Sequence, residues 1–147
     1  DQLLKKYPIK LIEDPFYEES WQSWTKLTEQ AGKKVQIVGN DLIATSEKLL
    51  QKAIKARAAN AILIKPNQIG TLSETISTYK EAKKAGWQTF VASRAGETKD
   101  SYLAHLAVGL GSEQTKLGAA AGSSSSEYNE LLRISDSLGS DLFRRLV

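Results

Sequence analysis

Short apolar segments alternate five times with amphipathic segments of helical period, and this alternation limits the fold more than any other feature of the chain. The apolar segments at residues 9–13, 35–39, 61–65 and 88–92 are predicted strands, and residues 113–118, which are mostly polar, are a weaker predicted strand. The predicted helices are residues 18–32, 46–58, 71–86, 101–111 and 126–139. Helices between strands predict parallel pairing, because parallel strands need crossover connections. The pattern therefore predicts an α/β fold, and both a doubly wound sheet and a (β/α) barrel fit it.

Length and composition favour one ordinary globular domain. The chain has 147 residues, a net charge of +3 and no cysteine, which excludes disulfides and thiolate metal sites and is compatible with a reducing compartment. Its lysine pairs are spread along the chain, so nucleic-acid binding, which needs a concentrated basic patch, is disfavoured. No apolar run has the length of a membrane span. Residues 1–7 resemble the tail of a helix, so we expect the chain to begin inside a larger protein.

Polar residues lie at or near the carboxyl end of every predicted strand. In chain order these are Glu13-Asp14, Asn40-Asp41, Lys65 with Asn67 and Gln68, Ser93-Arg94, and Lys116. Ligands of parallel α/β folds bind beyond the carboxyl ends of the strands, and barrels carry their catalytic residues there. Acids come first and bases later, which predicts a site for an anionic ligand at these strand ends.

The residue types indicate the chemistry of such a site. Carboxylates on neighbouring strands suit Mg²⁺, which prefers oxygen ligands. A lysine among other cations can lose its proton near neutral pH and act as a base, and an arginine can hold a carboxylate or a phosphate. The phosphate loops G-x-G-x-x-G and the P-loop do not follow the first predicted strand, which disfavours nucleotide binding.

Five segments together closely resemble the C-terminal barrel part of enolase: "YPIKLIEDPF", "VQIVGNDL", "AILIKPNQIGTLSET", "RAGETKDSYLAHLAVGLG" and "NELLRI". The resemblance covers the whole chain, residues 1–147. It implies five strand-helix units of an enolase-type (β/α) barrel with parallel strands, a partial barrel without the N-terminal capping domain and first barrel strands. It also implies the Mg²⁺-dependent lyase reaction of glycolysis, 2-phosphoglycerate to phosphoenolpyruvate, in a cytoplasmic protein.

The resemblance assigns metal ligands and catalytic lysines. Glu13 falls on a metal-binding carboxylate of the family. The family reads Gly-Asp-Asp-Leu where this chain has Asn40 and Asp41, so Asn40 stands at a metal-binding aspartate and Asp41 matches the second acid. Lys65 falls on the lysine that removes the substrate proton, and Lys116 on the second active-site lysine. The change at Asn40 removes a formal charge, so Mg²⁺ binding is doubtful in this chain.

The same resemblance assigns the substrate contacts. Arg94 matches the arginine that binds substrate phosphate, and Lys116 matches the lysine that holds the carboxylate end of the substrate. The family reads Ser-His-Arg-Ser-Gly-Glu-Thr, so Ser93 replaces a histidine and Ala95 replaces a phosphate-binding serine. Arg94, Lys65 and Lys116 could still form a residual site for a phosphate-type anion, or Arg94 could pair with Glu97.

Two functions therefore stay open at the level of sequence. One is the family's lyase, strongly impaired or inactive in this chain. The other is a non-catalytic structural or interaction subunit, a pseudoenzyme in an oligomer or larger assembly. A partial barrel has open edge strands, so we expect the remainder of an enolase-like chain, another protein or a second copy to cover them.

Three further groups of residues receive structural interpretations. We expect His105 on the surface or packed, and not as a ligand. Trp21, Trp24 and Trp87 are predicted to pack between helices and strands. The serine run 123–126, within the stretch 119–126 that is rich in alanine, glycine and serine, is predicted to form a loop.

Overall fold

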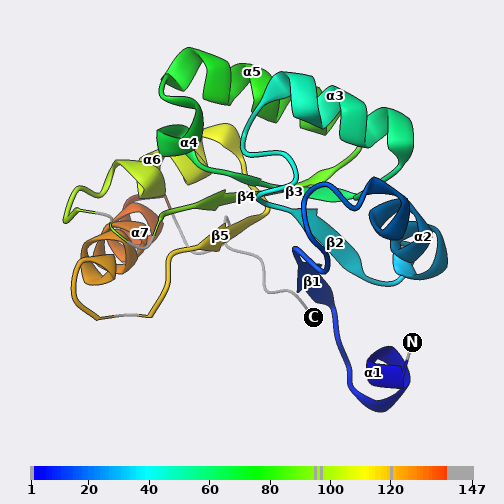
Figure 1. The fold of residues 1–147 in the computed structure, drawn as a ribbon. Helices are drawn as coiled ribbons and strands as arrows, with labels where there is room; N and C mark the ends of the chain where they lie inside the picture. The colour runs from blue at the N-terminus through cyan, green and yellow to red at the C-terminus, as the bar shows by residue number, and fades with distance from the viewer. Residues whose placement is uncertain (1, 95, 97, 120, 139–147) are drawn as a thin grey trace. The chain divides into compact units, whose positions relative to one another are not determined.

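The computed structural model describes residues 2–138 except 95, 97 and 120, and it divides into two compact units, residues 1–90 and 91–147. The first unit contains five helices and three whole strands, and strand β4 (Gln88–Ala92) passes from one unit into the other (Figure 1). The second unit adds helix α6 (Tyr102–Leu110), strand β5 (Gln114–Lys116) and helix α7 (Ser124–Leu138).

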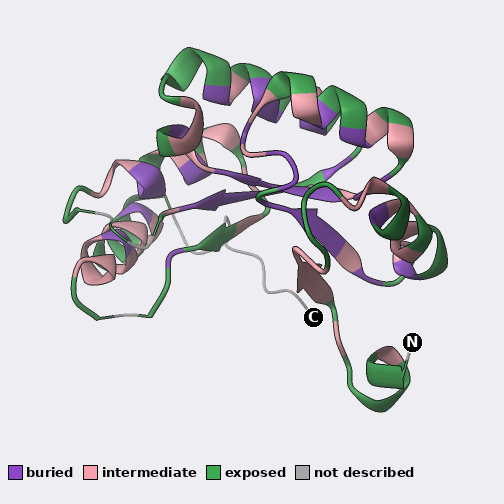
Figure 2. Cartoon of the chain, in the orientation of Figure 1, coloured by how far each residue is buried: buried purple, intermediate pink, exposed green. Residues whose placement is uncertain are grey.

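The first unit is built on parallel strands. Strand β1 (Leu11–Glu13) pairs with β2 (Gln36–Gly39), which pairs with β3 (Ala61–Ile64), and both pairs are parallel. The start of β4 continues this order through the hydrogen bond from the Gln88 N–H to the Asn60 carbonyl. All four residues of β3 are buried, as expected for a parallel strand covered on both faces (Figure 2).

Helix α3 (Glu47–Ala56) packs beside helix α5 (Leu72–Lys84), and both begin where the sequence predicts. The Ser46 hydroxyl caps α3 by accepting a hydrogen bond from the Leu49 N–H over 3.4 Å. Thr71 caps α5 in the same way, and its hydroxyl donates to the Glu74 carboxylate over 2.6 Å. Gly86, at φ 75°, follows the end of α5 in the left-handed conformation that glycine favours.

Helix α2 (Trp21–Ala31) packs its Trp24 into the core of the first unit, where the indole is fully buried and its N–H donates to the Tyr17 carbonyl. Trp87 is also buried, so the prediction of a packing role is confirmed for both residues. Trp21 differs, because it is partly exposed at the first position of α2 and lies under the Lys52 ammonium.

The second unit pairs the end of β4 with β5 and packs α6 against α7. The loop expected for the serine run 123–126 is wrong from Ser124 onward, because α7 begins there. The Ser125 hydroxyl donates to the Gly122 carbonyl, and Glu127 adds a carboxylate to the first turn, where the helix dipole favours it. Glu127 is buried, and its Oε2 accepts a hydrogen bond from the Ala104 N–H in the first turn of α6.

Two short helices complete the described chain. Helix α1 (Gln2–Lys6) agrees with the helical character predicted for residues 1–7. Helix α4 (Pro66–Ile69) was not predicted; it begins with proline at its first position, where the missing N–H costs nothing, and ends at Gly70. The five strands separated by helices confirm the α/β fold class with five strand-helix units.

Candidate functional site

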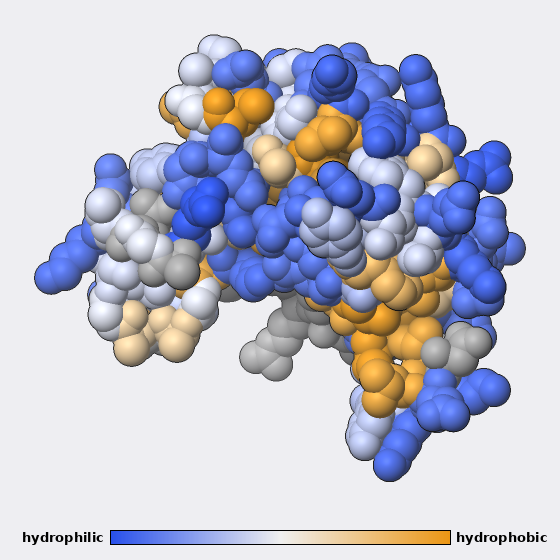
Figure 3. Space-filling view, in the orientation of Figure 1, coloured by the Kyte–Doolittle hydropathy of each residue, from blue (hydrophilic) through white to orange (hydrophobic). Residues whose placement is uncertain are grey.

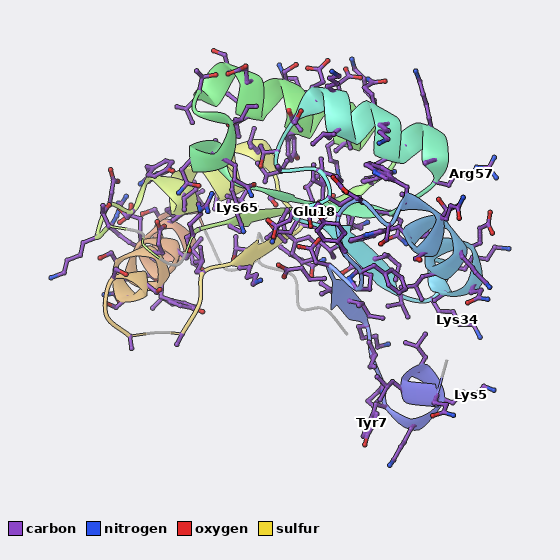
Figure 4. The ribbon with its side chains drawn as sticks, viewed as in Figure 1. Lys5, Tyr7, Glu18, Lys34, Arg57 and Lys65 are labelled. Atoms are coloured by element: carbon purple, nitrogen blue, oxygen red, sulfur yellow. The ribbon has the colours of Figure 1, made fainter. Side chains whose placement is uncertain are left out.

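Three side chains predicted from the strand ends meet in the first unit. Glu13 ends β1, Asn40 follows β2, and Lys65 follows β3 at the start of α4, where Figure 4 labels it. The Lys65 ammonium donates a hydrogen bond to Asn40 Oδ1 over 2.9 Å. Asn40 Nδ2 in turn donates to Glu13 Oε1 over 3.3 Å. The amide of Asn40 therefore joins a base to an acid from two different strands.

Chemistry fixes the orientation of the Asn40 amide. A lysine ammonium has three donors and no acceptor, so only the amide oxygen can face Lys65. The amide nitrogen then faces Glu13, whose carboxylate accepts. Asn40 is buried, so a reversed amide would set two donors against each other where water cannot separate them. The neutral amide thus bridges the two charged groups.

Asp14 holds the loop that carries Asn40. Its two carboxylate oxygens accept hydrogen bonds from consecutive backbone N–H groups, that of Asn40 over 2.9 Å and that of Asp41 over 3.0 Å. Asp14 has a φ of 41°, a left-handed conformation that aspartate tolerates better than most residues. The sequence marks Asp14 only as a polar strand end, and its role depends on the register of β1 with β2.

Asp41 is exposed, and it contributes its backbone N–H to this arrangement. Its metal-binding role, assigned from the resemblance, stays a prediction.

Thr45 fixes the backbone at Lys65 and was missed at the level of sequence. Its fully buried hydroxyl accepts a hydrogen bond from the Lys65 N–H over 2.9 Å and donates to Gln68 Oε1 over 3.0 Å. Its carbonyl accepts from the Thr78 hydroxyl. Ala44 and Thr45 both have positive φ values, 49° and 56°, so the loop after β2 adopts a strained path that these contacts support. A threonine within the loop gave no sequence signal for this role.

The second unit contains the remaining predicted residues. The Ser93 N–H donates to the Lys116 carbonyl over 3.4 Å, which brings the backbones at the ends of β4 and β5 together. Arg94 and Lys116 are exposed. Ala95 lies outside the described residues, as does Glu97, and with it the predicted pair with Arg94. The catalytic and substrate-binding roles of these residues stay predictions.

The first-unit residues do not fit the Mg²⁺ ion that the resemblance implies. A hard cation needs several oxygen ligands directed toward it. Here the Asn40 oxygen is directed at the Lys65 ammonium, and its amide nitrogen, which cannot bind a cation, is directed at Glu13. Over the described part of the chain, no group of three acidic, histidine or cysteine side chains is placed to hold a metal ion.

A separate charged cluster joins α6 to α7 in the second unit. His105 is exposed, as expected, and its Nε2 lies 2.6 Å from Glu130 Oε1. Arg133 donates to both oxygens of the same carboxylate. These hydrogen bonds, chiefly those from Arg133, hold the pKa of Glu130 below its usual range.

Comparison with known proteins identifies what this chain resembles. The family model described as "Enolase, C-terminal TIM barrel domain" matches residues 1–143. Enolase 2 of Hevea brasiliensis is 48% identical over 137 residues, 92% of this chain and 31% of that protein. Enolase of Solanum lycopersicum is 48% identical over 139 residues, 94% of this chain and 31% of that protein. The chain thus spans about a third of the length of these relatives. None of the described helices has the length and apolar character required to cross a membrane.

Proposed function

Because this chain belongs to the enolase family through its C-terminal barrel domain, we propose that it is an enolase-type domain that does not itself dehydrate 2-phosphoglycerate. The observation that carries the proposal is the position of the Asn40 amide between Lys65 and Glu13. Glycolytic lyase activity, Mg²⁺ dependence and a cytoplasmic location belong to the family expectation, and the proposal is that the first two are lost in this domain.

The absence of a negative charge at Asn40 explains the expected loss of Mg²⁺ binding and catalysis. The family has an aspartate here, and a carboxylate attracts a divalent cation far more strongly than a neutral amide does. A base must also be free to accept a proton, whereas the Lys65 ammonium is engaged with Asn40 Oδ1.

Changes in the second unit support the same proposal. Ser93 stands where the family has histidine, and Ala95 stands where it has a phosphate-binding serine. Each lost contact to a transition state typically costs about 10²–10³ in rate, so three altered positions leave little catalysis.

The test measures phosphoenolpyruvate formation by absorbance for the purified chain, with 2-phosphoglycerate and Mg²⁺. We expect no turnover and no heat of Mg²⁺ binding in calorimetry. An active enolase is assayed in parallel as the reference. Turnover by this chain at a comparable rate would overturn the proposal. The matched variant Asn40→Asp is expected to gain Mg²⁺ binding, and an unchanged titration of this variant would show that Asn40 is not the cause.

The second candidate function is a structural or interaction domain, and the edge of the first unit favours it. Strand β1 stands at the end of the strand order, and its Leu11 and Ile12 are partly exposed. Figure 3 shows a hydrophobic area over α1 and β1, where Leu3 is 63% exposed. We infer that the remainder of an enolase-like chain covers this edge, since exposed edges pair readily with further strands.

Association with the remainder of an enolase tests this second candidate. The part of the Solanum lycopersicum enolase that lies outside its match to this chain would be expressed separately and mixed with it. We expect a stable complex in which the β1 amide protons become protected from exchange. Absence of a complex, or a complex that leaves β1 unprotected, would contradict the inference.

A further inference from the structure

Helices α2 and α3 carry an exposed group of lysines that the enolase-type site does not use. We call Lys26 of α2 with Lys48, Lys52 and Lys55 of α3 the α2–α3 basic surface. We propose that this surface binds an acidic peptide segment of a partner protein. The proposal concerns the outside of the helices and does not depend on whether the strand-end site is active.

The three lysines of α3 lie along one face of the helix. Positions 48, 52 and 55 are four and three residues apart, which returns each side chain to the same side of an α-helix over a length of about 10 Å. Hydrophilic side chains predominate over the outer surface of α2 and α3 in Figure 3. A ligand that follows α3 therefore meets three positive charges in succession.

Two adjoining hollows give this surface its shape. One, of about 600 Å³, lies against Trp21, Thr25 and Lys26. The other, of about 800 Å³, lies against Lys48, Lys52 and Lys55. Both are also lined by Ala56, the last residue of α3, so the two open hollows lie next to each other at this residue.

Hydrogen bonds connect α2 to the chain at the end of α3, beside these hollows. The Thr25 hydroxyl donates a hydrogen bond to the Ala56 carbonyl over 2.9 Å, and the Thr28 hydroxyl donates to the Ala58 carbonyl over 2.8 Å. The Lys52 ammonium lies 3.9 Å from the centre of the Trp21 ring, which localises one positive charge at the junction by a cation–π contact. The Lys52 ammonium is therefore already in position before a ligand binds.

The positive charge of the surface is not neutralised within the described residues. None of its four lysines forms an ion pair there, whereas Lys84 and Arg133 on other helices do. Glu29 is the one described carboxylate that lines either hollow. Arg57, labelled in Figure 4 at the end of α3, adds a further exposed cation. Bound carboxylates would relieve the repulsion among these like charges.

The geometry favours an acidic peptide over a nucleic acid. Single-stranded nucleic acids gain affinity by stacking bases on aromatic rings, but Lys52 covers the Trp21 ring. Lys48 and Lys52 are about 6 Å apart along the helix axis, close to the roughly 6.6–6.8 Å between alternate side chains of an extended strand. An extended segment with acidic residues at alternate positions can therefore match successive lysines.

The experiment titrates the chain, at low salt, with a short fluorescein-labelled peptide that has glutamate at alternate positions. The double variant Lys48→Glu/Lys55→Glu is expected to weaken binding by about ten-fold or more, because both charges reverse on the contact surface. The matched control Lys5→Glu/Lys6→Glu makes the same change in net charge on α1 and is expected to stay within about two-fold of the unaltered chain. Circular dichroism confirms that both variants are folded.

Tryptophan emission gives a second readout of the same binding. Trp24 and Trp87 are buried, so a change in emission caused by the peptide should come from Trp21 and disappear in Trp21→Phe. An equal loss of binding in both double variants, or no binding at low salt, would overturn the proposal. Tighter binding of a single-stranded oligonucleotide of equal charge would overturn the assignment of the ligand class.

Discussion

The ammonium of Lys65 donates a hydrogen bond to the side-chain oxygen of Asn40 over 2.9 Å, although the two residues lie 25 positions apart and follow different strands. The amide nitrogen of Asn40 donates a hydrogen bond to the Glu13 carboxylate, so one neutral side chain connects the ends of β1, β2 and β3. Substitutions at Asn40, and at Asp14 and Thr45 that hold the adjoining backbone, are expected to change the stability of the chain.

Asn40→Ala should lower the free energy of unfolding by about 1–3 kcal/mol, because it leaves buried partners of two hydrogen bonds without the amide. Asn40→Asp keeps an acceptor for Lys65 and sets a second carboxylate beside Glu13. Mg²⁺ should therefore raise the melting temperature of Asn40→Asp and leave that of the unaltered chain unchanged. Thermal melts with and without Mg²⁺ measure this, and an equal response of both proteins would refute it.

Asp14→Ala should destabilise the chain by about 2 kcal/mol, because the N–H groups of Asn40 and Asp41 lose a charged acceptor and alanine tolerates the positive φ poorly. Asp14→Asn keeps one acceptor oxygen and the tolerance for this backbone, so it should lose about half as much. Urea unfolding at neutral pH compares the two. Equal losses would show that the carboxylate is not what holds the loop.

Thr45→Val should cost about 1–3 kcal/mol, since an isosteric methyl group replaces a buried hydroxyl that serves both the Lys65 N–H and Gln68. Thr45→Ser retains the hydroxyl and is the matched control, expected within about 1 kcal/mol of the unaltered chain. Chemical denaturation gives both values. If valine is tolerated as well as serine, the hydroxyl does not support the backbone at Lys65.

Glu127→Ala should destabilise the packing of α6 on α7 by at least about 2 kcal/mol, because it opens a cavity and removes one of the two acceptors of the Ala104 N–H, which also donates to the Ser101 carbonyl. Glu127→Gln keeps an acceptor oxygen of nearly the same size and should cost less. Hydrogen exchange at Ala104 reports the loss locally. Unchanged protection of this amide in Glu127→Ala would contradict the assignment.

The contact of Glu130 with Arg133 and His105 predicts a dependence on acid. The pKa of Glu130 is lowered in the folded chain, so its contribution to stability is present above about pH 4.3, the value for an unfolded glutamate, and is lost as the pH falls below it. Thermal melts across this range, compared with Glu130→Gln, measure the effect. The difference between the two proteins should shrink toward acid pH, and a constant difference would refute the linkage.

Several features could be predicted from the sequence because they depend on neighbouring residues. The period of apolar side chains predicts the alternation of strands and helices. The hydroxyls of Ser46 and Thr71 mark helix starts, because each bonds an N–H three residues further along. The polar strand ends Glu13, Asn40 and Lys65 were also identified in advance, because parallel strands end at the same edge of a sheet. By contrast, the start of α7 at Ser124 was missed, since serine alone is a weak helix former.

The contacts among these residues were decided by the tertiary structure. The register that pairs Glu13 with Val38 puts Asp14 beside the backbone of Asn40 and Asp41, and no local pattern specifies that register. In the same way, the side chains that meet between α2 and α3 include Lys52, which lies over the Trp21 ring. The order of elements and the chemical types at the strand ends follow from the sequence alone, because side-chain period and helix capping depend on neighbouring residues. Which of those groups meet is decided only in the folded chain, because it depends on contacts between residues far apart in the sequence.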